Sequence, residues 1–138
     1  MKVIFLDIDG VLNKKANSAP TVCKIEEKQL ALLAELVKQS DANIVLTSSW
    51  RLAANAPWRE PFSKVGVTVA DQTICLNGNN RQREILLYLD AHKDVESFVI
   101  LDDQEGRFGK LKSNRVLVDS RTGLTKENIA KALKILEK

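Results

Sequence analysis

Short apolar segments alternate with longer stretches whose apolar residues recur at helical spacing. This alternation constrains the fold more than any other feature, because each short run has the length and the Val, Ile and Leu content of a strand buried in a parallel sheet. The segments predicted as strands are residues 3–8, 43–47, 65–69, 97–101 and 115–118. Strands separated by helices imply right-handed crossovers. We therefore predict an α/β fold: one doubly wound, Rossmann-like parallel sheet of five strands with helices on both faces.

Helices are predicted between these strands, over residues 21–39, 51–62, 81–92 and 126–136. In three of them apolar residues line one face and charged residues the other, as in helices that cover a sheet. The second contains Pro57 and Pro61, which lack a backbone donor and are expected to interrupt it. A chain of 138 residues is the length of one domain, and we predict a single domain over residues 1–138.

The overall charge and the two cysteines exclude some classes of protein. A formal net charge of +3 is compatible with an anionic partner, but it falls short of the dense positive face of a dedicated nucleic-acid binder. Cys23 and Cys75 are far apart and form no metal-binding or redox motif. The first apolar run meets Asp7 too early for a signal peptide, and no apolar run reaches the ~20 residues of a membrane helix. We expect a cytoplasmic protein with no membrane partner.

Polar side chains follow three of the predicted strands. Asp7 and Asp9 end the first strand, Thr47 and Ser48 the second, and the pair Asp102-Asp103 the fourth. In a doubly wound sheet the ligand crevice lies beyond the carboxyl ends of the strands, so these groups should converge. Four carboxylates in one crevice repel one another unless a cation neutralises them, and oxygen ligands favour Mg²⁺.

A pair of carboxylates beside Mg²⁺ is suited to phosphoryl transfer. One ionised carboxylate can attack phosphorus to form an aspartyl-phosphate, while its neighbour moves a proton to or from the ester oxygen. The metal offsets the repulsion between the attacking anion and the phosphate. A hydroxyl from a neighbouring strand end and a cationic side chain would hold the other phosphoryl oxygens.

The motif residues resemble those of the haloacid dehalogenase (HAD) superfamily of phosphotransferases. Residues 7–12, Asp-Ile-Asp-Gly-Val-Leu, match its first motif, residues 45–47 look like its second, and residues 100–103 look like its acidic fourth. The longer segments FLDIDGVLN, LTSSWR and LDD are similar to those of small HAD domains associated with RNA-repair proteins. The resemblance covers residues 3 to about 125 and implies a Mg²⁺-dependent phosphatase.

The resemblance also implies a role for each motif residue. Asp7 becomes the nucleophile and Asp9 the general acid and base. Asp7, the backbone carbonyl of Asp9, and one or both of Asp102 and Asp103 would hold Mg²⁺. Thr47 would bind the phosphoryl group, although Ser48 is close enough in sequence to be the contact instead.

The basic residues of the predicted phosphate site differ from the family pattern. The family places a Lys at or before the helix that precedes the fourth strand, whereas this helix begins Asn-Arg-Gln-Arg, so Arg81 is the expected replacement. Its planar fork supplies the charge in a different shape from an ammonium group. Arg51 directly follows the second motif and is a second candidate for contact with the substrate phosphate.

Cap domains in this superfamily are inserted after the first motif or after the third strand. Residues 13–40 hold little beyond a loop and the first crossover helix, and residues 72–80 hold only a turn, so no cap domain is expected. An uncapped crevice admits large ligands. The predicted substrates are therefore a nucleic-acid end, a nucleotide or another large phosphorylated molecule.

Other interpretations stay open from the sequence. A PIN-like metal-dependent nuclease is also a small α/β protein with clustered acids, but it uses metal-bound water and needs no aspartate nucleophile. A non-catalytic HAD-like binding module is suggested by the missing third-motif Lys. Individual polar residues also have structural alternatives, because Ser48 and one of Asp102 and Asp103 could cap the helices that follow them. The oligomeric state is not readable from the sequence.

Overall fold

The computed structural model describes residues 1–14, 25–48, 58–76, 80–106 and 108–137. These residues form an α/β fold whose sheet contains five strands, all paired in parallel. The strands are β1 (Lys2–Leu6), β2 (Asn43–Leu46), β3 (Val69–Gln72), β4 (Ser97–Asp102) and β5 (Arg115–Leu117). The helices are α1 (Glu27–Ser40), α2 (Arg59–Lys64), α3 (Arg81–Ala91) and α4 (Lys126–Leu136), with a 3₁₀ helix at Gly109–Asn114.

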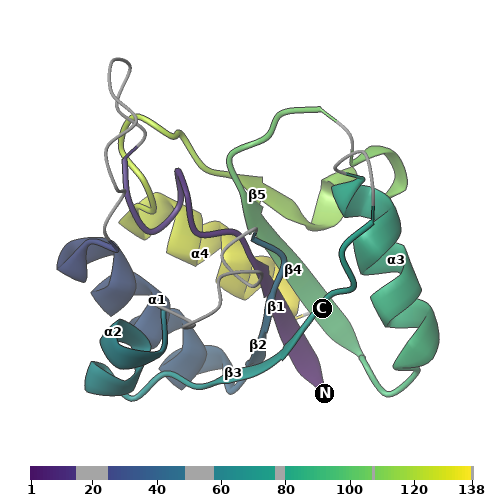
Figure 1. Cartoon of the computed structure of the whole chain (residues 1–138), viewed down its shortest axis with the longest axis horizontal. Coiled ribbons are helices and arrows are strands. Elements are labelled where there is room, and N and C mark those ends of the chain that lie inside the picture. The colour runs from purple at the N-terminus through teal and green to yellow at the C-terminus, as the bar shows by residue number, and fades with distance from the viewer. Residues whose placement is uncertain (15–24, 49–57, 77–79, 107, 138) are drawn as a thin grey trace.

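The order of strands across the sheet is β3-β2-β1-β4-β5 (Figure 1). The chain moves outward from β1 through β2 to β3, and then crosses back to place β4 on the other side of β1. The direction of winding therefore reverses between β1 and β4, and ligands of doubly wound sheets bind at the carboxyl ends of such a pair. The register pairs Leu6 with Leu101, so the residues that follow these two strands emerge next to each other.

Helices cover both faces of the sheet, as predicted. Alternate strand residues point to opposite faces. Ile4, Leu6 and Leu101 belong to a core cluster that includes residues of α1, α2 and α4, whereas Phe5 and Ile100 belong to a second cluster with residues of α3 and the 3₁₀ helix. In Figure 1, α3 lies on the side of the sheet opposite α1, α2 and α4. Both faces of the central strands are buried, which explains their continuous apolar sequence.

The third strand does not lie where the sequence predicted it. The strand expected at residues 65–69 begins only at Val69, because Val65 and Gly66 form the turn that ends α2. Gly66 has a positive φ of 73°, and the Val67 N–H donates to the carbonyl oxygen of Phe62. Val67 is buried in the core, so its apolar side chain reflects packing beneath α2. β3 itself is an exposed edge strand of polar sequence.

The first two helices also differ from their predicted ranges. The helix predicted from residue 21 begins at Glu27, and Glu26 has an extended backbone whose N–H donates to the Leu12 carbonyl oxygen. Of the helix predicted at 51–62, residues 51–57 lie outside the described residues, and α2 covers Arg59–Lys64. Pro61 was expected to interrupt this helix, but it lies in the first turn, where its missing N–H has no intrahelical partner to lose.

The last two helices begin at capped residues. The Asn80 side chain accepts a hydrogen bond from the Arg83 N–H at the start of α3. Thr125 and Asn128 form a reciprocal capping box at the start of α4, which matches the predicted range of 126–136. No helix in the described part of the chain is long and apolar enough to span a bilayer.

Candidate active site

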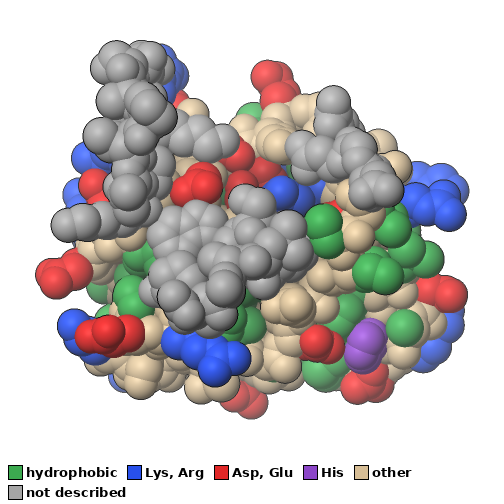
Figure 2. Space-filling model, in the orientation of Figure 1, with side chains coloured by type: hydrophobic (Ala, Val, Ile, Leu, Met, Phe, Trp, Pro, Cys, Tyr) green, Lys and Arg blue, Asp and Glu red, His purple; other side chains and the backbone are tan. Residues whose placement is uncertain are grey.

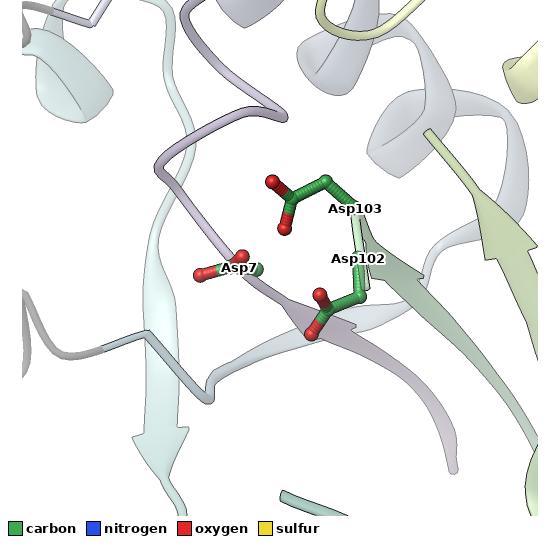
Figure 3. Close-up of side chains that lie close together, drawn as sticks. All are labelled: Asp7, Asp102 and Asp103. Atoms are coloured by element: carbon green, nitrogen blue, oxygen red, sulfur yellow. The ribbon is translucent and has the colours of Figure 1, made fainter. Parts of the chain in front are cut away.

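Three acidic side chains meet beyond the carboxyl ends of β1 and β4 (Figure 3). Asp7 follows β1, Asp102 ends β4, and Asp103 follows it. Each offers a carboxylate oxygen, and these oxygens lie within 4.8 Å of one another. Asp102 is fully buried and Asp7 is 6% exposed. The convergence predicted from the three strand ends is therefore present for these carboxylates.

Backbone hydrogen bonds that continue the sheet hold the strand ends together. The Asp7 N–H donates to the Leu101 carbonyl oxygen at 3.0 Å, and the Thr47 N–H donates to the Leu6 carbonyl oxygen at 2.9 Å. These bonds extend the pairing of β1 with β4 and with β2 by one residue, so Thr47 emerges beside Asp7. Thr47 and Ser48 are both buried, at 0% and 1% exposure. Arg51 lies outside the described residues.

A tight turn at Gly10 carries Asp9 away from the cluster. Gly10 has a φ of 84°, and a Cβ at this position would overlap the carboxylate of Asp103. Both the conformation and the close approach therefore require glycine. The Asp9 side chain is not part of the cluster; its Oδ1 accepts a hydrogen bond from the amide of Asn13 at 3.2 Å. The sequence led us to expect four clustered carboxylates, and the structure brings together three.

Asn13 is a site residue that the sequence analysis missed. Its Oδ1 accepts from the Gly10 N–H at 2.8 Å, its Nδ2 donates to Asp9, and the residue is 2% exposed. One buried amide thus fixes both the turn and the Asp9 carboxylate. The signal was present as the last residue of the FLDIDGVLN segment, but an Asn in a loop is so common that its side chain could not be placed from sequence alone.

Arg81 extends from the first turn of α3 into the same site. Its Nη1 donates to Oδ2 of Asp102 at 2.7 Å and lies 3.5 Å from Oδ1 of Asp7. The Arg81 residue is 7% exposed, and its buried Nε has no hydrogen-bond partner among the described residues. The structure therefore places the arginine expected in the third motif beside two of the three carboxylates. Figure 2 shows acidic side chains next to basic ones near the upper centre of this face.

Burial makes the charges of this cluster unfavourable. Burial, and then the neighbouring Asp102 carboxylate, raise the pKa of Asp7 from 3.8 to about 7, although Arg81 opposes this shift. Burial also raises the pKa of Asp102, again against the effect of Arg81. Burial by itself would lower the pKa of Arg81, but Asp7 and Asp102 outweigh it and raise that pKa. One guanidinium thus compensates only partly for the buried carboxylates.

A family comparison agrees with this geometry. The family model described as the HAD domain in Swiss Army Knife RNA repair proteins matches residues 3–129. The chain belongs to this family of HAD domains. Comparisons with curated proteins and with solved structures give no match. Family membership indicates hydrolase-type chemistry in general, and HAD enzymes typically use a divalent metal ion.

The carboxylates of this HAD domain fit a divalent cation. The clustered donors are all oxygens, which hard cations such as Mg²⁺ prefer over the nitrogen and sulfur ligands that zinc takes. A cation would also offset the burial and the neighbouring Asp102 charge that raise the pKa of Asp7. Both oxygens of Asp102 already accept hydrogen bonds, Oδ2 from Arg81 and Oδ1 from the Gln104 N–H. These bonds fix the orientation of Asp102 within the cluster.

Glu84 supports the site of the HAD domain from the next turn of α3. The residue is 2% exposed, and its Oε2 accepts a hydrogen bond from the Leu76 N–H at 2.8 Å. Its negative charge also adds to those that raise the pKa of Arg81. Glu84 was missed by the sequence analysis, because on a helix at this spacing it looks like an ordinary surface residue.

Proposed function

We propose that this HAD domain is a Mg²⁺-dependent phosphomonoester hydrolase that works through an aspartyl-phosphate on Asp7. The observation that carries the proposal is the place of Asp7: a buried carboxylate at the point where the winding of the sheet reverses, between two further acids and one guanidinium. Family membership supports the hydrolase class, and the acidic cluster supports a metal.

The proposed reaction has two steps. A carboxylate oxygen of Asp7 attacks phosphorus, the bond from phosphorus to the ester oxygen breaks, and Asp9 gives its proton to the leaving alkoxide. Asp9 then takes a proton from water as that water attacks the phosphorus of the acyl phosphate, which releases inorganic phosphate and regenerates Asp7. The amide of Asn13 holds the Asp9 carboxylate for both transfers.

Other groups would hold the phosphate and the metal. Asp7, the Asp9 backbone carbonyl and one or both of Asp102 and Asp103 would hold Mg²⁺, which would supply positive charge against the phosphoryl oxygens. Arg81 has its Nη1 3.5 Å from Oδ1 of Asp7, close enough for its guanidinium to bind a phosphoryl oxygen beside the nucleophile.

The proposed substrates are a nucleic-acid end, a nucleotide or another large phosphorylated molecule. Among the described residues, neither the connection after β1 nor the connection from β3 to α3 carries an added folded unit that would cover the crevice. The family is associated with RNA repair, which favours the nucleic-acid end within this class.

A panel of phosphomonoesters assayed with Mg²⁺ tests the proposal. It should include nucleotides and oligonucleotides phosphorylated at the 5′ or the 3′ end. We expect phosphate release that disappears on chelation and in Asp7→Asn. Cleavage within an oligonucleotide that survives Asp7→Asn would instead indicate a metal-dependent nuclease. Binding without any release would indicate a non-catalytic module.

A further inference from the structure

A groove lies between α1 and the start of α4, apart from the acidic cluster. Its volume is about 640 Å³, within the range of pockets that hold small organic ligands. Four of its lining residues are basic: Lys14, Lys28, Arg121 and Lys126. We call it the α1–α4 groove. No acidic residue lines it among the described residues.

The lysines of the groove are available to an anion. Lys14, Lys28 and Lys126 are exposed, and none of them takes part in an ion pair within the described part of the chain. Arg121 differs, because its guanidinium donates two hydrogen bonds to the Asp119 carboxylate. Lys28 and Lys126 lie in the first turns of α1 and α4; at the start of α1 no side chain caps the backbone N–H groups, and such free N–H groups favour anions.

A buried carboxamide in the groove lacks a hydrogen-bond donor. Gln29 is 3% exposed and lines the groove; its Nε2 donates to the Thr122 carbonyl oxygen at 3.1 Å. Its Oε1 is buried and accepts no hydrogen bond from any described residue. A buried acceptor left unsatisfied is costly, so a ligand N–H or O–H group that reaches this oxygen through a small shift of the carboxamide would remove that cost. Ala31, which is exposed, and Leu32, which is half-buried, add apolar surface to the groove.

These three features together match one chemical class. Lysines suit a phosphodiester, apolar surface suits the face of a base, and an acceptor suits the amino or hydroxyl group of a base or ribose. A simple inorganic anion would leave the apolar surface and the Gln29 oxygen unused. A nucleotide unit uses all of them.

The groove adjoins the loop that follows Asp7 and Asp9, residues 10–13. The Leu124 N–H donates to the Val11 carbonyl oxygen at 2.8 Å, and the Glu26 N–H donates to the Leu12 carbonyl oxygen at 2.8 Å. A Cβ on Gly123 would contact the carbonyl oxygens of Val11 and Asn13, so the two loops pack closely. The segment after Gly10 therefore has the acidic crevice on one side and the groove on the other.

From this arrangement we infer that the α1–α4 groove binds an inner nucleotide of an oligonucleotide whose phosphorylated end lies at Asp7. The inference has two parts. Binding of a nucleotide unit in the groove is argued from the groove alone, whereas the position of the reacting end at Asp7 rests on the proposed phosphatase function. Such a site would make the enzyme prefer oligonucleotides to mononucleotides.

Two double variants with the same change in charge test the inference. Lys28→Gln with Lys126→Gln removes two groove lysines, and Lys38→Gln with Lys131→Gln removes two exposed lysines of the same helices outside the groove. For the first, the ratio of kcat/KM for a phosphorylated oligonucleotide to that for a mononucleotide should fall about tenfold. For the same variant, the logarithm of the binding constant for the oligonucleotide is plotted against the logarithm of the salt concentration. The slope should be shallower than that of the wild type by about 0.7 for each phosphate that the groove no longer neutralises. The second should keep the wild-type ratio within about twofold.

A binding measurement separates this inference from the phosphatase proposal. An oligonucleotide with hydroxyl ends cannot react, so its binding requires no turnover. It should shift the side-chain amide NMR signals of Gln29 and bind more weakly to the groove variant than to the control variant, even if no phosphatase activity is found. Equal binding to both double variants would overturn the inference. So would Gln29 signals that stay unshifted when the oligonucleotide is saturating.

Discussion

Asp7 lies in surroundings that disfavour its own charge. Because its pKa rises from 3.8 unfolded to about 7 folded, the folded protein binds more protons than the unfolded chain between these values. The stability that comes from this group is present at low pH and is lost as the pH rises toward 7. The metal-free protein should therefore lose stability across this interval, and a bound cation should reduce the loss.

Asp7→Asn removes the charge while keeping the shape of the side chain. At pH 7.5 to 8 without metal, we expect the free energy of unfolding to rise by up to about 4 kcal/mol, because the rise in the pKa of Asp7 from 3.8 to about 7 sets the cost of the ionised carboxylate. Urea unfolding of both proteins between about pH 4 and pH 8 measures this. Parallel pH profiles for the two proteins would show that Asp7 ionises without cost.

Asn13 allows the positioning of Asp9 to be tested apart from the turn. Asn13→Ala removes both hydrogen bonds, so it should lower kcat by about tenfold or more and cost roughly 1–3 kcal/mol of stability, because the buried Gly10 N–H loses its acceptor. Asn13→Asp keeps an acceptor for Gly10 but sets a carboxylate against Asp9. It should lose activity as well, because repulsion between the two carboxylates displaces that of Asp9. Wild-type kcat in Asn13→Asp would contradict the role given to this amide.

At the scale of elements, the start of α3 positions Arg81. Asn80→Ala removes the cap, and Thr125→Ala removes the equivalent cap of α4 as a matched control. Each should cost about 1 kcal/mol. Only Asn80→Ala should also raise KM for a small phosphomonoester, because fraying of the first turn moves the guanidinium. Equal kinetic effects from both variants would mean that general stability, rather than the position of Arg81, sets the activity.

The elements that the sequence predicted well are those whose environment is uniform along their length. β1 and β4 are buried on both faces, so their apolar runs in the sequence end close to the observed strand ends. The prediction that Asp7 and Asp102 lie close together, made from those ends, is therefore confirmed. The prediction of α4 matched because one apolar face runs along its whole length; the cap at Thr125 is seen only in the structure. The predicted position of β3 was wrong because an exposed edge strand has no apolar pattern. The nearby Val65 lies in a turn, and Val67 packs into the core.

The details of the site depended on contacts that have no sequence signature. The convergence of the polar strand ends could be predicted from the motifs, but the hydrogen bonds of Asn13 and Glu84 arise from the path of two loops. The same applies to the α1–α4 groove. Its lysines are distant in sequence and look like ordinary solvent-exposed residues until the fold brings them together.

At the scale of the whole molecule, a divalent cation should act as a stabilising ligand. Mg²⁺ at about 100 times its dissociation constant should add about 2.7 kcal/mol to the free energy of unfolding. Asp103→Asn should lose much of this gain. Asp119→Asn is the matched control, because this nearby acid is paired with Arg121 and lies outside the cluster. Thermal unfolding with and without Mg²⁺ measures the effect, and equal gains in both variants would contradict the assigned metal site.

The central claim is that phosphate passes through a covalent bond to Asp7, and borohydride trapping tests it most directly. The enzyme is mixed with a substrate found in the panel, the reaction is stopped during turnover, and the acyl phosphate is reduced, which converts the modified aspartate to homoserine. We predict that peptide mass spectrometry finds homoserine at position 7, in an amount that increases in Asp9→Asn if hydrolysis of the intermediate slows more than its formation. Sustained phosphate release with residue 7 always recovered as aspartate would contradict the account.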